Sequence, residues 1–360
     1  MTEATQDRLA SWITAEIDRC GPGARLPTMR ELMRRFRTSQ RVVERALAPF
    51  IATGQLEVRR GLGIVIRDPV PSAPAHEADI LLLYKVSDSR LARTLILEIE
   101  KRMKAAGISI LLLGFTDEAQ ALSILSRIGR FRVCLLQTHF ETLPLPFLSR
   151  ITEIADSVVF DGISATGLRM DAIGTNWREA FALAWRNLRA AGHERIGFLP
   201  SAHSARPIAM ARREYQRLSD AAGQGAGWLI ELDALPGSFP GADISTSIAG
   251  LRGDDGALSV TGLITWGVVE GYLLDRALWE NGIVPGRDLS VMMLGSVDFP
   301  SEHLNRFDTV GNADAEKIDT FERVLRDRLT PDGPPPEVHY LPIHTARFGS
   351  VDDLTVDVTG

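Results

Sequence analysis

Cysteine, lysine and long apolar runs are scarce in this chain of 360 residues. Cys20 and Cys134 lie far apart and lack metal-ligand spacing, which argues against a disulfide framework and a zinc site. No apolar run reaches membrane-spanning length, and the first residues are polar, unlike a secretion signal. We therefore expect no metal, no membrane partner and a cytoplasmic location.

Charge is divided unevenly along the chain. Residues 1–70 contain 12 arginines, no lysine and 8 acidic residues, a net charge of +4, whereas the whole chain carries −6. The rest of the chain therefore carries −10. This asymmetry predicts a segment that faces nucleic acid, attached to an acidic body.

The first 54 residues have the patterns of three helices. Apolar residues recur at helical spacing over 9–17, and Gly21 to Gly23 end that helix. Thr28 and Glu31 form a capping-box signature, which predicts the start of a second helix. Ser39 can cap a third helix, which Gly54 closes. Two short helices joined by a tight turn predict a helix-turn-helix.

Two alternating apolar runs follow over residues 55–67, around the glycines Gly61 and Gly63. This pattern predicts a β-hairpin with Arg59 and Arg60 at its tip. Guanidinium groups pair with phosphate oxygens and base edges, and glycine lets the backbone approach closely. The hairpin therefore suits a nucleic-acid groove.

The stretch LPTMRELMRRFRTSQRVVERALAPFIATGQLEVRRGLGIVI closely resembles the winged-helix signature of GntR-type bacterial regulators, over roughly residues 5–67. The resemblance implies a winged helix-turn-helix that binds a double-stranded DNA operator. The residues at the family's DNA-binding positions lie at the two helix starts and the hairpin tip: Thr28, Arg30, Ser39, Gln40, Arg41, Arg45, Arg59, Arg60, Gly61 and Gly63.

Two kinds of DNA contact are expected within that set. Gln40 and Arg41 can make bidentate bonds to adenine and guanine edges, so they would read the sequence. Because Gln40 and Glu44 occupy positions where the family usually has a basic residue, the operator sequence stays open. Phosphate neutralisation, which sets affinity and its salt dependence, would come from Arg30, Arg45, Arg59 and Arg60.

Three prolines within residues 68–75 predict an extended linker, which we assign to 68–77. Beyond it, strand-like runs alternate with amphipathic helices, first over 80–155 and again from about 171 onward. This alternation predicts two parallel sheets and a two-lobed α/β domain over 78–349, followed by a C-terminal tail over 350–360. The winged helix would occupy residues 1–67.

Four segments of the larger part occur in a characteristic order: DAIGTNWREA (171–180), AGHERIGFL (191–199), NGIVPGRDLSV (281–291) and DTV (308–310). They resemble the effector domain of lac-repressor-like regulators, which is similar to sugar-binding periplasmic proteins. The resemblance spans about residues 78–349. It implies a small polar effector, such as a sugar, held between two lobes, and a homodimer formed through this domain.

Ligands of open α/β sheets bind beyond the carboxyl ends of the strands, so the loops there supply the candidate effector site. Departures from the family pattern at Asn176-Trp177, Thr265-Trp266 and Glu214 leave the effector's identity open. Aromatic and hydrogen-bonding loop residues would suit a sugar or similar polar ring: Ser87, Asp88, Arg90, Gln137, His139, Asp161, Trp177, Ser201, His203, Arg206, Trp266 and Asp298.

An effector that closes the lobes would change the relative pose of two winged helices in a dimer, and so the affinity for DNA. A dimer presents two recognition helices to half-sites about one helical turn apart. Family habit favours a repressor. This mechanism needs neither a catalytic residue nor a cofactor, so we expect no enzyme activity.

Three alternatives stay open. Some regulators with this type of winged helix carry an aminotransferase-like domain that holds pyridoxal phosphate on a lysine. A periplasmic solute-binding protein is opposed by the polar N-terminus and the basic segment. A sensor domain without a ligand could serve for dimerisation alone. Against the first alternative, few lysines follow the linker: Lys85, Lys101, Lys104 and Lys317.

Overall fold

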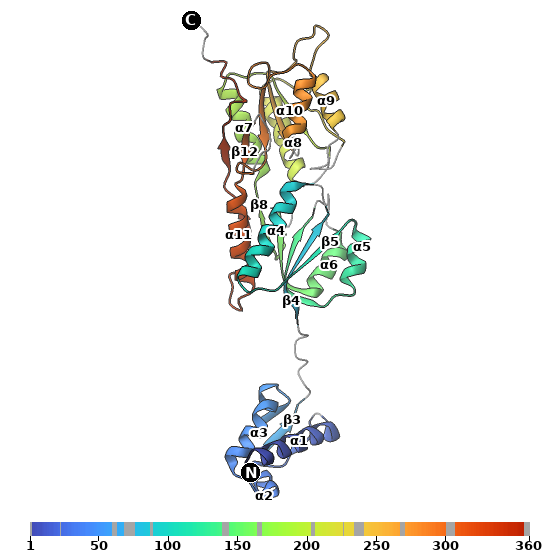
Figure 1. Ribbon diagram of the computed structural model, residues 1–360, viewed down its shortest axis with the longest axis vertical. Helices are drawn as coiled ribbons and strands as arrows, with labels where there is room; N and C mark the ends of the chain where they lie inside the picture. Colours follow the sequence, from blue (N-terminus) through green and yellow to red (C-terminus); the bar gives the residue numbers. More distant parts are fainter. Residues whose placement is uncertain are drawn as a thin grey trace. The chain divides into compact units, whose positions relative to one another are not determined.

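The computed structural model describes residues 2–21, 23–59, 63–67, 76–86, 89–138, 144–163, 168–202, 206–225, 227–233, 241–266, 271–299 and 307–355. The chain divides into two compact units, Met1–Ala75 and His76–Gly360, and each is described by itself. Figure 1 shows the elements of both units.

The N-terminal unit consists of helices packed against a small sheet. In the described residues the helices are α1 (Thr2–Cys20), α2 (Met29–Phe36) and α3 (Gln40–Ala52). The strands β1 (Arg25–Leu26), β2 (Leu56–Arg59) and β3 (Gly63–Ile66) form an antiparallel sheet in the order β1-β3-β2. The buried core draws on all three helices and the sheet: Leu9, Ile13, Leu26, Leu32, Val43, Ala46, Leu47, Leu56, Ile64 and Ile66.

The start of α2 confirms the predicted capping box. The amide of Glu31 donates to Thr28 Oγ1 at 3.4 Å, and the Glu31 carboxylate accepts from the Thr28 amide at 2.7 Å. Ser39 occupies the N-cap position of α3, but its hydroxyl makes no capping hydrogen bond. The expected side-chain cap is therefore wrong, and the Ser39 hydroxyl is exposed instead.

The second unit begins with a lobe built on a parallel sheet, here called lobe one. Its strands, in the order β13-β8-β7-β6-β4-β5, are β4 (His76–Lys85), β5 (Ile110–Phe115), β6 (Arg130–Gln137), β7 (Ala155–Asp161), β8 (Asp171–Gly174) and β13 (Val338–Tyr340). Helices α4 (Arg90–Ala105) and α11 (Asp314–Arg328) cover one face, and α5 (Glu118–Leu125) and α6 (Leu145–Ile154) cover the other.

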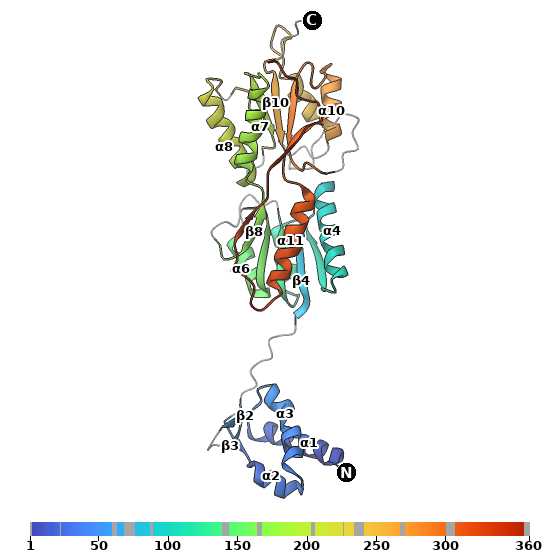
Figure 2. The same ribbon diagram turned by 90° about the vertical axis from the view of Figure 1, so that its left-hand side faces the viewer.

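Lobe two is built on a five-stranded sheet in the order β14-β12-β11-β10-β9. The strands β9 (Ile196–Pro200), β10 (Gly262–Trp266), β11 (Ser290–Leu294) and β12 (Asp308–Gly311) are parallel, and β14 (His344–Ala346) is antiparallel. Helices α7 (Trp177–Ala190) and α8 (Arg206–Ala221) cover one face, and α9 (Gly241–Ala249) and α10 (Gly271–Glu280) cover the other (Figure 2). The predicted two-lobed α/β fold with parallel sheets is confirmed.

Three passages of the described chain join the lobes: β8 to α7, β12 to α11, and β13 to β14. Two of them are tied together by a buried hydrogen bond of 2.8 Å, which Thr175 Oγ1 donates to Asn312 Oδ1. The third is tied to the first, since the Leu341 amide donates to the Gly174 carbonyl at 3.0 Å. Hydrogen bonds therefore link all three passages to one another at the hinge between the lobes.

Residues 350–355, which fall in the expected C-terminal tail, pack against lobe two. The Asp308 carboxylate accepts from the amides of Phe348, Gly349 and Ser350 at 2.7, 2.9 and 3.2 Å. Ser350 is buried, and its carbonyl accepts from the amide of Val291 on β11 at 2.8 Å. A buried aspartate thus anchors the end of the described chain.

Candidate functional site

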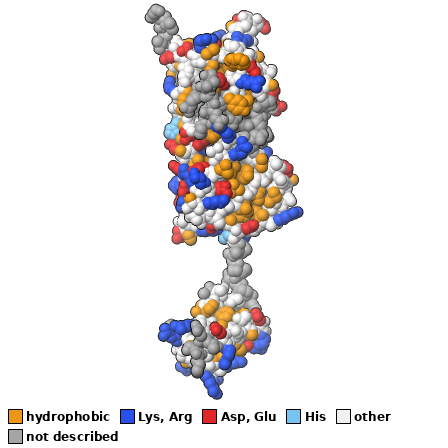
Figure 3. Space-filling view, in the orientation of Figure 1, with side chains coloured by type: hydrophobic (Ala, Val, Ile, Leu, Met, Phe, Trp, Pro, Cys, Tyr) orange, Lys and Arg blue, Asp and Glu red, His pale blue; other side chains and the backbone are white. Residues whose placement is uncertain are grey.

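The N-terminal unit presents a polar face at the start of α3. Apolar side chains of α3 face the core, including Val43 and Leu47. The polar residues at the start of α3 and along its first turns are exposed, as are two predicted contacts at the start of α2. The exposed set is Thr28, Arg30, Ser39, Gln40, Arg41, Glu44 and Arg45. In Figure 3, arginine side chains stand out around the edge of this unit.

Local contacts set what this face can offer to a ligand. Gln40 Nε2 donates to Glu44 Oε1 at 2.8 Å, so the amide is already engaged by a carboxylate one turn away. The exposed Ser39 hydroxyl lies at the N-terminus of α3, where free amides and the helix dipole favour an anion. Arg41 and Arg45 are exposed on the same helix. The helix start is therefore suited to a phosphate oxygen.

The hairpin brings its two strands together as the sequence indicates. Arg59 pairs with Gly63, and Leu56 pairs with Ile66. Gly63 has a φ of +85°, a conformation that favours glycine. The predicted tip residues Arg60 and Gly61 lie outside the described residues, as does the side chain of Arg59.

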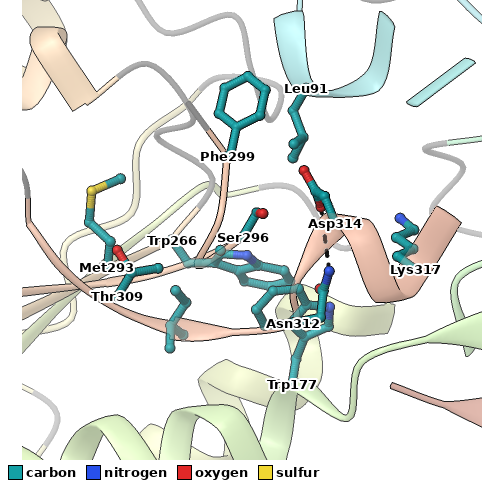
Figure 4. Close-up of a pocket in the computed structure, with 12 residues that line it drawn as sticks. Leu91, Trp177, Trp266, Met293, Ser296, Phe299, Thr309, Asn312, Asp314 and Lys317 are labelled. Atoms are coloured by element: carbon teal, nitrogen blue, oxygen red, sulfur yellow. Dashed lines mark hydrogen bonds between the residues drawn. The ribbon is translucent and has the colours of Figure 1, made fainter. Parts of the chain in front are cut away.

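A pocket lies in the second unit where residues of both lobes meet (Figure 4). Its volume is about 160 Å³. That is below the ≈ 300 Å³ at which small-molecule sites usually begin. Trp177 and Trp266 line it side by side, with ring centroids 4.7 Å apart and ring planes inclined by 32°. A sugar-sized ligand would therefore need the tryptophans or the lobes to move.

Polar side chains enter the pocket from α11 and the segment before it. Asn312 Nδ2 donates to Asp314 Oδ1 at 3.5 Å, the contact drawn in Figure 4. Burial raises the pKa of Asp314, and the nearby Lys317 ammonium offsets only part of that effect. Lys317 Nζ itself lies 2.7 Å from Asp161 Oδ1. The pocket thus combines aromatic faces with an amide and a carboxyl group that can exchange hydrogen bonds.

Of the predicted effector residues that the structure describes, Trp177 and Trp266 line this pocket. Arg90 lies beside it, with its guanidinium carbon 5.1 Å from the ring centroid of Phe299, a lining residue. Gln137 is turned into lobe one, where its Nε2 donates to Asp161 Oδ2 at 2.9 Å. Asp161 is therefore held by Gln137 and Lys317 rather than being open to a ligand.

The seven remaining predictions have different outcomes. Ser201 is fully buried and does not line the pocket. Arg206 lines a separate hollow between α7 and α8. Asp298 does not line the pocket either, although it lies next to it in the chain segment after β11. The others lie outside the described residues: Ser87, Asp88, His139 and His203.

Asp298 caps a helix instead of facing a ligand. The amides of Asp314 and Ala315 donate to its two carboxylate oxygens at 2.5 and 3.1 Å, and Ser296 Oγ donates at 2.9 Å. Burial alone would raise the pKa of Asp298, but these donors together lower it below its usual value. A residue of lobe two thus caps α11, a helix of lobe one, whose own N-cap residue, Ala313, has no capping side chain.

Most lining residues were missed from the sequence. The available signal was the position of Asn312 and Asp314 directly after the last parallel strand. Nothing in the sequence indicates that the following helix, α11, returns to lobe one. The missed residues are Leu91, Met293, Leu294, Gly295, Ser296, Phe299, Thr309, Asn312, Asp314 and Lys317.

Other kinds of site find little support in the described residues. No group of three histidine, cysteine, aspartate or glutamate side chains there is placed to hold a metal ion. Burial raises the pKa of the Cys134 thiol to about 12, which suppresses its reactivity. None of the described helices combines the length and apolar character needed to cross a bilayer.

No protein-family model matches the sequence, and a search of curated proteins found no match. Solved structures do resemble it. A LacI family transcriptional regulator from Enterococcus faecium with bound ribose has a TM-score of 0.63 at 16% identity, over 76% of this chain and 99% of that one. The regulator CCPA of the same family from Weissella paramesenteroides, with bound glucose, has a TM-score of 0.61 at 16% identity, over 77% and 99%.

The two-lobed unit shares its fold with LacI family regulators. A complex of the transcriptional regulator CelR with cellobiose covers 86% of this chain and 90% of that chain, with a TM-score of 0.59 at 14% identity. These structures are described as transcriptional regulators, not as enzymes. The lac-repressor-like resemblance of the larger domain is thereby supported at the level of fold. The GntR-type resemblance of the N-terminal unit stays a prediction.

Proposed function

We propose that this chain is a DNA-binding transcriptional repressor whose operator affinity is modulated by a small polar metabolite of the sugar class. The observation that carries the proposal is the pairing of two units in one chain. One is an arginine-rich unit with an exposed helix start, and the other is a two-lobed body with a pocket at its hinge. Such a regulator acts where its operator lies, in the cytoplasm, and needs no cofactor.

In this proposal residues 1–67 form a GntR-type winged helix-turn-helix. The capped α2, the exposed start of α3 and the antiparallel hairpin support it. Gln40 and Arg41 read bases, once Gln40 leaves Glu44. The linker at 68–77 joins this unit to the effector domain at 78–349. Phosphates are bound by Arg30, Arg45, Arg59 and Arg60.

The effector binds in the pocket at the hinge. Trp177, Trp266 and Phe299 offer aromatic faces for the apolar side of a sugar ring, and Asn312 and Asp314 offer hydrogen bonds to its hydroxyl groups. Ribose, glucose and cellobiose in the similar structures favour this class of ligand. Binding would alter the hinge, because Asn312 also bonds to Thr175.

Two copies would associate through the second unit. Tyr272 and Trp279 on α10 are 52% and 80% exposed, and Leu97 on α4 is 60% exposed. Tyr272 and Trp279 are seven residues apart and so share one face of α10. Figure 3 also shows hydrophobic side chains gathered over the side of lobe one that carries β5. Exposed apolar surface of this kind marks interaction sites, and a homodimer would cover it.

A thermal-shift screen of the full chain with ribose, glucose and cellobiose tests the effector assignment. A sugar in large excess over its Kd should stabilise the protein by about 2 to 4 kcal/mol. The substitution Asp314→Asn should reduce that shift, whereas Asp332→Asn, on an exposed residue outside the pocket, should retain it.

One alternative has an observation in its favour. The pocket is small, and the stacked rings of Trp177 and Trp266 form part of its wall. A body of this kind can serve for dimerisation without any ligand. If no sugar shifts the melting temperature while DNA binding is intact, this alternative replaces the effector assignment.

A further inference from the structure

Four arginines and one glutamate line a hollow of about 500 Å³ between α7 and α8. Figure 2 shows these helices side by side on one flank of lobe two. Arg178 comes from the first turn of α7, and the others lie along α8 from its first residue. The charged lining residues are Arg178, Arg206, Arg213, Glu214 and Arg217.

Glu214 holds two of these arginines in place. It is 4% exposed, and its Oε2 accepts from Arg178 Nε at 2.8 Å. Its two oxygens also accept from Arg217 Nε, both at 3.1 Å. Arg217 contributes most to lowering the pKa of Glu214, and Arg178 adds to the effect, although burial alone would raise that pKa. One ionised carboxylate therefore fixes guanidinium groups from two different helices.

The charge of the hollow is far from balanced. Three exposed arginines, Arg178, Arg213 and Arg217, line the hollow beside the single carboxylate of Glu214, on a unit whose net charge is −10. Arg178 and Arg217 side chains are still 61% and 56% exposed, and Arg213 is exposed too. The first turn of α7, which carries Arg178, adds partial positive charge. An anion would relieve this repulsion.

We propose that this hollow is a second ligand site, separate from the hinge pocket, which binds the phosphoryl group of a small metabolite. Guanidinium forks match the geometry of phosphate oxygens and bind them through two hydrogen bonds at once. The volume lies in the range of small-molecule sites, about 300 to 1,000 Å³. This site goes beyond the proposed sugar response, because it shares no lining residue with the hinge pocket.

The position of Arg178 connects the two sites. It directly follows Trp177, which lines the hinge pocket and stacks on Trp266. An anion bound by Arg178 would displace the first turn of α7. This displacement would also move Trp177, which stacks on Trp266. The phosphoryl site is therefore placed to change the affinity of the hinge pocket for its ligand.

Titration of the full chain with pyrophosphate at constant ionic strength tests the site, with binding measured by calorimetry. Because the N-terminal arginines can also bind phosphates, the comparison uses variants of matched charge. Arg213→Gln should weaken pyrophosphate binding at the hollow about tenfold, as expected for the loss of a charge-assisted donor, and leave binding by the N-terminal arginines unchanged. Arg186→Gln, on an exposed arginine of α7 outside the hollow, should leave that binding unchanged.

Equal losses in the two variants would overturn the proposal, since they would show a general effect of charge. Absence of any pyrophosphate binding that Arg213→Gln affects would overturn it as well. Citrate binding as tightly as pyrophosphate would overturn the phosphoryl assignment. None of these three results depends on whether a sugar binds in the hinge pocket. Failure of the phosphoryl site is therefore distinguishable from failure of the proposed function.

Discussion

The carboxylate of Asp298 connects the two lobes. It accepts from the amides of Asp314 and Ala315 at the start of α11, in place of the capping side chain that Ala313 cannot supply. Because the carboxylate is fixed by donors that favour its charged form, it stabilises the folded state only while it is ionised. Asp298 therefore stabilises the hinge between the lobes, and it does not line the neighbouring pocket.

The substitution Asp298→Ala should lower the free energy of unfolding by about 0.5 to 2 kcal/mol, the usual cost of losing a helix cap. The folded-state pKa of Asp298 is lowered, so its contribution is present above the unfolded-state pKa, about 3.9, and is lost as the pH falls through the lower folded value. Urea denaturation at pH 7 and under acid conditions should show the difference from the unmodified chain shrinking at low pH. Asp332→Asn should show no such pattern.

Arg41 and Arg30 should differ in what they contribute to DNA binding. Arg41→Ala should cost roughly 1 to 3 kcal/mol at one base position and loosen sequence preference, because guanidinium contacts to guanine are specific. Arg30→Ala should weaken matched and scrambled operators alike, since a phosphate contact is not specific. Fluorescence anisotropy with both operators measures this. Equal effects of the two substitutions on both operators would contradict the division of roles.

At the scale of elements, local signals predicted more than long-range ones. The capping box at Thr28 and the glycine-containing hairpin depend on neighbours in the sequence, so their positions could be predicted. Trp177 and Trp266 were found because each lies at the carboxyl end of a strand or just beyond one. The return of α11 to lobe one, which brings Asp314 and Lys317 to the pocket, depends on tertiary packing through Phe321 and its neighbours.

The same limit explains why several predicted effector residues have partners within the protein. Asp298, Gln137 and Asp161 lie in loops or strand ends of the expected kind, but partners distant in the sequence engage them. Ser39 has the right position for a cap, yet its side chain stays exposed. A pattern places such residues near a site but does not reveal which hydrogen bonds they make.

The hinge between the lobes can be tested through Thr175. Thr175→Val removes the hydroxyl that donates to Asn312 Oδ1 and leaves a buried acceptor without its partner. The free energy of unfolding should fall by about 1 to 3 kcal/mol. Thr152→Val, which removes an exposed hydroxyl on α6, should cost much less. Equal costs in urea denaturation would show that the hinge bond does not stabilise the fold.

At the scale of the whole molecule, the proposed regulator binds its operator as two copies of the chain. Trp279→Glu places a charge on the exposed apolar face of α10 and should shift the protein toward monomers, because burying an unpaired charge in an interface is costly. Analytical ultracentrifugation measures the change in assembly. Val58→Glu, at an exposed apolar residue of the N-terminal unit, should leave the dimer intact. An unchanged dimer with Glu at position 279 would place the interface elsewhere.

The most direct test is the salt dependence of binding between the full chain and DNA from its own promoter region. Phosphate contacts by Arg30, Arg45, Arg59 and Arg60 in each of two copies predict a slope of log K against log salt of about −7, and of roughly half that for a monomer. A ligand of the hinge pocket should change the affinity at fixed salt. Absence of salt-sensitive binding to double-stranded DNA would contradict the proposed regulator.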